Sequence, residues 1–269
     1  MEECMFDYKL ALIILVFAIP GVVVTIPRLL KKLSGTVAAK IPEGKKLPPM
    51  PVLATVQIAQ SLLLVGGFAF LGAYLAPRVG LSAPVFSAIA RGGGIVRSLP
   101  NPVPVLLLSL AGSAVFLAMY YLVFQRWLDR QSAIAMDELR NEIGIVSRLL
   151  YGGVVEEIIA RWGVMTLLVW LLSRVPFTTT SPAIWISIVV SGLLFGLGHT
   201  PSYLAAGCKK SVAFYTAEFV LNVWASLFFG YLFWKYGLFA AMVSHMVYHL
   251  VWFPIDLAVQ HRRRASVYA

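Results

Sequence analysis

Long apolar stretches recur along the chain, and short segments between them carry most of the charges. A helix that crosses a bilayer needs about 20 mostly apolar residues, so each charge-poor run of this length is a candidate span. We predict seven spans, at about Met5–Pro27, Val52–Ala76, Pro102–Phe124, Ser147–Leu172, Pro182–Thr200, Ser211–Trp234 and Leu238–Leu257. The pattern therefore predicts an all-α, polytopic integral membrane bundle.

The segment from Arg126 to Arg148 departs from this pattern, because it mixes charges of both signs with apolar residues. This mixture is typical of an amphipathic helix that lies at the membrane interface. A short additional span here would make eight crossings, so we expect seven or eight. No internal repeat is visible, and we treat residues 1–269 as one membrane domain.

Composition agrees with the span count. The 269 residues are 59% hydrophobic and 13% charged, whereas a soluble domain is roughly 25% charged. The net charge of +10 falls mainly between the spans, which favours topology and lipid headgroups over nucleic acid as its cause. The acidic N-terminus and the long first run predict a retained span rather than a cleaved signal peptide.

The loops on the side of the first connection and the C-terminus contain most of the Lys and Arg residues. Cytoplasmic loops carry such an excess. We therefore expect an integral protein of the cell membrane, with its N-terminus outside and its C-terminus in the cytoplasm.

Three charged residues, Glu156, Glu157 and Arg161, interrupt the fourth apolar run. A charge at the bilayer centre costs from about 2.5 to more than about 10 kcal/mol, so this cluster suggests chemistry. Glu157 and Arg161 are four residues apart, which places them on one face of a helix as an ion pair. Glu156 points about 100° away and is left for another role.

Three histidines are predicted at the same depth as Glu156. With a rise of ~1.5 Å per residue, Glu156 lies ~12 Å from the cytoplasmic edge of its span. His199, His245 and His249 lie ~10 to 16 Å from the corresponding edges of the fifth and seventh spans. If the helices are regular, acid and imidazole groups from three spans therefore converge.

Three motifs carry these residues: EExxxR from Glu156 to Arg161, FxxxH from Phe195 to His199, and HxxxH from His245 to His249. In this order they resemble the motifs of the CAAX prenyl endopeptidases of the Rce1 type, within the larger CPBP group. The similar stretch covers about 151–252, inside a core at 147–257. His249 departs from the family, which usually has Asn or Asp there.

The resemblance implies a glutamate-dependent intramembrane endopeptidase without an essential metal or other cofactor. Glu156 and His199 would deprotonate a water that attacks the scissile carbonyl, near the cytoplasmic leaflet. His245 and His249 would stabilise the oxyanion, Glu157 and Arg161 would fix the helix, and Phe195 would support the site by packing. The substrate would be a peptide or protein at the membrane, such as a prenylated C-terminus, a leader peptide or an anchored regulator.

The residues themselves are compatible with this chemistry. An imidazole can donate to an oxyanion, as an Asn side chain does, so His249 can partly substitute for Asn. The i,i+4 pair His245 and His249 also has a metal-ligand spacing, so a zinc-dependent membrane hydrolase is an alternative. A non-enzymatic scaffold or immunity-type protein is another. Glu218 is predicted to make a hydrogen bond between helices rather than to serve in the site.

Overall fold

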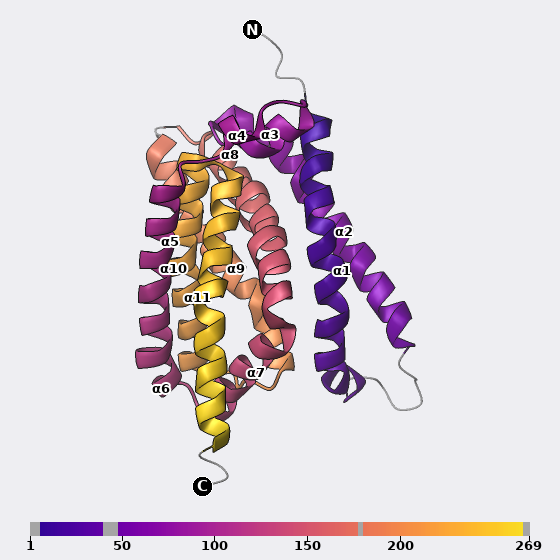
Figure 1. Cartoon of the computed structure of the whole chain (residues 1–269), viewed down its shortest axis with the longest axis vertical. Coiled ribbons are helices and arrows are strands. Elements are labelled where there is room, and N and C mark those ends of the chain that lie inside the picture. The colour runs from indigo at the N-terminus through magenta and orange to yellow at the C-terminus, as the bar shows by residue number, and fades with distance from the viewer. Residues whose placement is uncertain (1–5, 40–47, 177–179, 266–269) are drawn as a thin grey trace.

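A computed structural model describes residues 6–39, 48–176 and 180–265, with side chains omitted at 36–39 and 263–265. Within these ranges every regular element is a helix, and the long helices run roughly parallel to one axis (Figure 1). The predicted all-α fold class is confirmed.

The N-terminal part forms a pair of long helices and a small cap. Its elements are α1 (Tyr8–Ala39), α2 (Met50–Leu75), η1 (Ala76–Val79), α3 (Pro84–Ala90) and α4 (Ile95–Ser98). Helix α1 continues well beyond the predicted end of the first span, because its basic last turns contact α7. There Lys32 Nζ lies 3.0 Å from Glu142 Oε2. Figure 1 shows α3 and α4 at the same end of the molecule as the start of α1.

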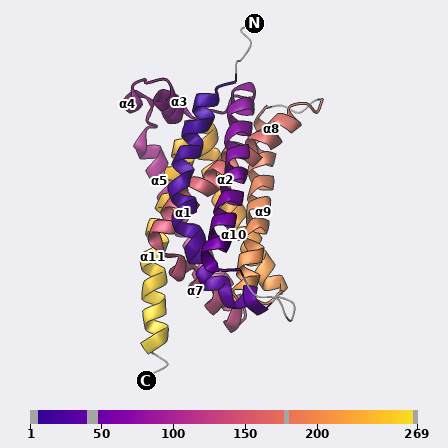
Figure 2. The same cartoon turned by 90° about the vertical axis from the view of Figure 1, so that its right-hand side faces the viewer.

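The rest of the chain forms the larger part of the bundle. Its elements are α5 (Pro102–Ala118), η2 (Met119–Phe124), α6 (Gln125–Trp127), α7 (Arg130–Ser147), η3 (Arg148–Glu156), η4 (Ile158–Met165), α8 (Thr166–Leu172), α9 (Thr180–Ala205), α10 (Val212–Tyr236) and α11 (Leu238–Ala265). Figure 2 shows α9 and α10 behind the N-terminal pair in the turned view.

Among the described residues, six helices are long and apolar enough to cross a membrane. They correspond to all the predicted spans except the fourth. That fourth run is also helical, as η3, η4 and α8, but Arg148, Glu156, Glu157 and Arg161 give it too much charge to stand out as an apolar helix. Helix α1 begins at one end of the molecule and α11 finishes at the other, as an odd number of crossings requires (Figure 1).

The fourth run is not a regular α-helix. Residues Arg148–Glu156 and Ile158–Met165 are wound as π-helix, in which the backbone bonds i to i+5. The regular winding assumed in the depth estimate is therefore wrong for this segment. Helix α9 instead runs through Pro201 to Ala205 without ending at the proline. Wide π turns recur at functional sites of proteins.

Helix α7 coincides with the predicted amphipathic segment and lies at the end of the bundle opposite α3 and α4 (Figure 1). Asp129 caps it, accepting the Ser132 backbone N–H at 3.0 Å and the Ser132 hydroxyl at 2.6 Å. These hydrogen bonds from Ser132 lower the pKa of Asp129. At Gly144 the chain kinks, with φ of 74°, and turns into η3. Glycine adopts this left-handed φ without the penalty other residues incur.

Close helix contacts hold the fourth run at the centre of the bundle. The Trp162 side chain is buried, and its Nε1 donates a hydrogen bond to the Ala69 carbonyl of α2 at 3.0 Å. Gly72 of α2 lies against the Trp162 ring, where any Cβ would collide with it. Small residues at helix interfaces permit such approach within membranes. The segment that carries the glutamates is thereby fixed against α2.

Candidate active site

A cavity of about 470 Å³ lies between the helices that carry the three motifs. Its wall includes Glu156 from η3, His199 from α9, and both His245 and His249 from α11. Ionisable side chains within membrane bundles almost always face the bundle interior or a cavity, and they mark functional sites. The four residues that we predicted as catalytic therefore share one space.

Glu156 lies between two imidazoles. Its Oε1 is 3.7 Å from His199 Nε2, and its Oε2 is 3.8 Å from His245 Nε2. These distances are too long for direct hydrogen bonds, but one water can bridge groups separated in this way. The Glu156 side chain keeps 19% of its surface accessible, so the carboxylate is open to the cavity.

The backbone of α9 orients His199. Its Nδ1 lies 2.8 Å from the Phe195 carbonyl oxygen, one helical turn earlier. A carbonyl only accepts, so Nδ1 carries the hydrogen, and in neutral His199 the Nε2 lone pair faces Glu156. The Phe195 ring also packs edge-on against His199, with centroids 4.6 Å apart.

Glu157 has a second partner that sequence spacing did not reveal. Arg161 Nη1 donates to its Oε1 at 3.3 Å, so the predicted ion pair is present and fully buried. The same Oε1 lies 2.7 Å from Nδ1 of His245 on α11. Glu157, which lies between η3 and η4, therefore joins the fourth run to α11 and fixes the ring orientation of His245.

His249 stacks on His245, with ring centroids 4.8 Å apart and planes inclined by 27°. The absent side chain of Gly152 makes room for it, since a Cβ there would lie 2.6 Å from His249 Nε2. The Phe229 ring also stacks on His245, with centroids 4.6 Å apart. Both imidazoles are thus held in place by packing from three helices.

Arg161 packs against two aromatic rings that contact the histidines of the site. Its guanidinium carbon lies 5.4 Å from the Phe195 ring centroid and 5.2 Å from that of Phe229. Such cation–π contacts are stronger when they are removed from water. The arginine, Phe195 and Phe229 together form a layer behind His199 and His245.

No group of three or more His, Cys, Asp or Glu side chains in the described part of the chain is arranged to hold a metal ion. The pair His245 and His249 is the one whose spacing suggested zinc in the sequence. Their rings stack, and His245 Nδ1 is already bonded to Glu157. Stacked rings do not direct their lone pairs to one point, whereas zinc requires convergent ligands.

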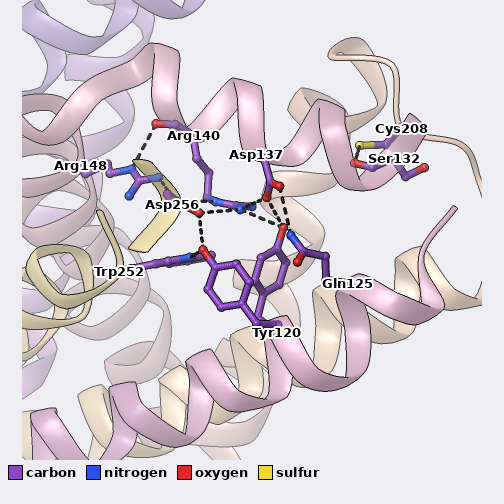
Figure 3. A network of polar contacts seen from close by, with 10 residues as sticks. Tyr120, Gln125, Ser132, Asp137, Arg140, Arg148, Cys208, Trp252 and Asp256 are labelled. Carbon is purple, nitrogen blue, oxygen red and sulfur yellow. Dashed lines mark hydrogen bonds and ion pairs between the residues drawn. The ribbon is translucent and has the colours of Figure 1, made fainter. Parts of the chain in front are cut away.

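Other polar residues line the cavity in addition to those predicted. Glu218 accepts a hydrogen bond from the Thr200 hydroxyl at 2.9 Å, which is a bond between helices as predicted, but it also faces the cavity. Arg140 and Arg148 line the end nearest α7, where they meet Asp137 and Asp256 (Figure 3). The mixed charges of 126–148 are the sequence signal for the α7 part of this cluster, but the interfacial helix that they predict does not account for the burial of Asp137 and Arg140.

Fold and site together define an integral membrane protein, a helical bundle with an acid–imidazole cavity at the meeting of its helices. Residues 141–251 match the family model Rce1-like, described as type II CAAX prenyl endopeptidase Rce1-like. The match confirms the family predicted from the three motifs, and it identifies this segment as that of a protease-like membrane hydrolase. Searches among curated proteins and among solved structures gave no match.

Proposed function

We propose that this protein is an intramembrane endopeptidase in which Glu156 and His199 activate a water molecule for peptide-bond hydrolysis. The observation that carries the proposal is the position of the Glu156 carboxylate, 3.7 Å from His199 Nε2 and 3.8 Å from His245 Nε2. The similarity of 141–251 to the Rce1-like family supports the reaction class.

Water activation follows from the orientation of the two groups. The ionised Glu156 carboxylate and the Nε2 lone pair of His199 are both acceptors, and a water between them donates one hydrogen to each. Its oxygen lone pairs then point away from both groups, toward a substrate carbonyl in the cavity. As the oxygen attacks, Glu156 or His199 takes the proton, a contribution of about 100- to 10,000-fold in general-base catalysis.

In this mechanism His245 and His249 stabilise the oxyanion that forms on the substrate carbonyl. His245 Nδ1 donates to Glu157, so Nε2 can donate to an oxyanion only when the ring is doubly protonated. Glu157 stabilises that imidazolium through the 2.7 Å contact. His249 supplies a second N–H, in place of the amide that Asn supplies elsewhere. Removing one such donor costs about 100- to 1,000-fold in other enzymes.

The proposed substrate is a peptide or protein presented from the membrane, with a prenylated C-terminus as the first candidate. Apolar residues form the cavity wall toward α1 and α2, including Leu29, Leu64 and Val164. This wall suits a lipid chain or an apolar side chain, and the polar groups of the motifs suit the peptide. The matching family is described as a CAAX prenyl endopeptidase, which supports a prenylated substrate.

The direct test is cleavage of a panel of prenylated and unprenylated C-terminal peptides by purified protein, followed by mass spectrometry. We expect wild type to cleave, and Glu156→Gln to lose at least about 100-fold in kcat while remaining folded. Glu138→Gln is the matched control, because that α7 carboxylate is 56% exposed and distant from the motifs. Full activity of Glu156→Gln would remove Glu156 from the mechanism.

Treatment with a chelator distinguishes the proposed metal-independent mechanism from that of a zinc hydrolase. We expect protein treated with a strong chelator, and shown by elemental analysis to be free of zinc, to cleave the same peptide at an unchanged rate. Activity that disappears with the metal and returns on adding zinc would favour the metal-dependent alternative instead.

A further inference from the structure

Glu218 of α10 is a buried carboxylate that takes no part in the activation of water described above. The residue is 2% exposed, and it belongs to the wall of the cavity that holds Glu156 and His199. Its Oε2 accepts a hydrogen bond from the Thr200 hydroxyl at 2.9 Å. Within the described ranges, its Oε1 is buried without a hydrogen-bond partner. One oxygen of this carboxylate is therefore left to accept from a ligand.

The surroundings of Glu218 differ from those of other buried carboxylates in the bundle. Glu157 and Asp256 both bond to arginine side chains. Glu218 instead meets the Thr200 hydroxyl, which is neutral and cannot balance a negative charge. A buried acceptor without a donor loses its hydration uncompensated, and an ionisable residue inside a membrane bundle indicates a functional site. A residue that only joined α9 to α10 would need one acceptor and no charge.

The packing of α10 against α9 places Glu218 beside His199. Thr200, which bonds to Glu218, directly follows His199 in the chain, and consecutive Cα atoms are ~3.8 Å apart. Gly196 permits the close approach, since a Cβ there would already lie 3.5 Å from the Glu218 main-chain oxygen. Asn222 Nδ2 donates at 2.7 Å to that main-chain oxygen and not to the carboxylate. The unpaired acceptor is thus close to the proposed water-activating pair.

Peptide hydrolysis creates hydrogen-bond donors at the leaving nitrogen. The water oxygen forms the new C–O bond, the proton taken by Glu156 or His199 passes to the nitrogen, and the C–N bond breaks. The nitrogen of a peptide carries a single hydrogen. It gains a second with this proton, and the newly formed carboxylic acid supplies the third that makes an ammonium ion. An acceptor at this nitrogen therefore stabilises the transition state and the product more than the substrate.

We propose that Glu218 is a further catalytic residue, whose Oε1 accepts hydrogen bonds from the leaving nitrogen and holds the ammonium until the product departs. This proposal rests on the proposed function, and it assigns the leaving-group side of the site to α10. The Thr200 hydroxyl orients the carboxylate through Oε2. The cation that forms in the reaction is the counter-ion that the resting site lacks.

The test compares a prenylated peptide with a matched depsipeptide, in which oxygen replaces the N–H of the cleaved bond. Hydrolysis of the ester releases an alcohol, which gains no charge. In Glu218→Gln we expect kcat/KM to fall at least about tenfold for the peptide and to stay within about threefold of wild type for the ester, because only the peptide loses a charge-assisted hydrogen bond. Gln keeps an oxygen for the Thr200 hydroxyl, so the contact between α9 and α10 is retained.

Glu138→Gln is the matched control, because this α7 carboxylate is 56% exposed, and it should keep wild-type rates on both substrates. An equal loss on peptide and ester in Glu218→Gln would show a structural role and overturn the proposal. Unchanged cleavage of the peptide would also overturn it.

A second experiment uses wild-type protein alone, so it decides the question even if Glu218→Gln fails to fold. The C-terminal cleavage fragment is compared as an inhibitor with the same fragment acetylated at its amine, at about pH 6.5, where an α-amine with a pKa of ~7.7 to 8.0 is protonated. We expect the free amine to inhibit at least about tenfold more strongly, since acetylation removes the cation. Equal inhibition by the two fragments would overturn the amine site and leave the protease function standing.

Failure of the proposed function has a different signature. If wild type cleaves neither the peptide nor the ester, the protease function fails. The two fragments, carrying a fluorescent label, are then compared as ligands of wild type by fluorescence anisotropy. Tighter binding of the free amine supports the Glu218 site, and equal binding rejects it.

Discussion

Glu156 and Glu157 are neighbours in sequence, yet their carboxylates lie in different surroundings. Glu157 is fully buried and bonded to Arg161 and His245. Glu156 is partly accessible and has imidazoles near it at 3.7 and 3.8 Å. Successive side chains of a helix point in different directions, and this rotation produces the division. One carboxylate is therefore available to a substrate, and the other holds the site together.

Replacing each glutamate by Gln should give different results. Glu156→Gln should lose cleavage by at least about 100-fold with little change in thermal stability, because its imidazole neighbours lie 3.7 and 3.8 Å away and it makes no direct hydrogen bond with them. Glu157→Gln should lower both, since a neutral amide leaves Arg161 without its counter-ion and no longer stabilises a charged His245 ring. Rates and melting temperatures in detergent, measured on the same preparations, check this. Equal loss of stability in the two variants would contradict the division of roles.

At Gly152, the addition of a single methyl group should slow catalysis. In Gly152→Ala the new Cβ would lie 2.6 Å from His249 Nε2, so the imidazole must move away from the cavity. We expect kcat to fall at least about tenfold, as the loss of a precisely placed oxyanion donor predicts. Gly67→Ala in α2 is the matched control, because its Cβ would meet nothing within 4 Å. Unchanged kcat in Gly152→Ala would show that His249 does not take part.

At the scale of elements, the fourth run is the one on which the site depends. Its π-wound halves η3 and η4 pack against α2 through Trp162 and against α11 through Glu157. Three charged side chains in this segment are fully or mostly buried, so their bonds to neighbouring helices offset the cost of desolvation. Polar contacts therefore fix the position of this helix more than its own hydrophobicity does.

Substitution of Arg161 tests whether polar contacts hold the fourth run in its position. Arg161→Ala leaves Glu157 as an uncompensated buried charge, which typically costs about 3 to 5 kcal/mol in free energy of unfolding. We expect a lower melting temperature in detergent and a lower yield from membranes. Arg174→Ala, an exposed arginine just after α8, should change neither. Wild-type stability of Arg161→Ala would mean that packing alone holds the segment.

At the scale of the whole molecule, the six apolar helices and the fourth run place α7 and the α9–α10 connection at one end, and α3 and α4 at the other (Figure 1). The basic residues concentrate at the α7 end of the described chain and in the tail that follows α11. We propose that this end faces the cytoplasm, as the distribution of Lys and Arg indicates.

Cysteine labelling in intact cells tests this orientation. In a background with Cys4→Ser, Arg97→Cys in α4 should react with a membrane-impermeant maleimide, and Lys209→Cys should react only after permeabilisation. The native Cys208 serves as an internal control: burial raises the pKa of its thiol to about 12, so it should stay unlabelled. The reverse pattern of labelling would invert the topology.

The apolar runs alone determined most of the architecture. Burial of apolar groups in lipid and internal backbone bonding leave helices as the available solution, so length and hydropathy locate the spans. The same pattern predicted that Glu156, His199 and His245 meet, although the regular winding behind the depth estimate does not hold in η3, and the local spacing gave the Glu157–Arg161 pair. These features depend on residues that are close in sequence or on distance along one helix.

Only the tertiary structure decided which side chains meet between helices. The bond from His245 to Glu157, the space that Gly152 leaves for His249, and the cluster of Arg140, Arg148 and Asp256 all join different elements. Such contacts depend on the rotation and tilt of each helix, which the π winding of η3 and the kink at Gly144 alter. A hydropathy pattern fixes the position of a residue along the helix axis but not the rotation of the helix about that axis. These contacts could therefore not be predicted from the sequence pattern.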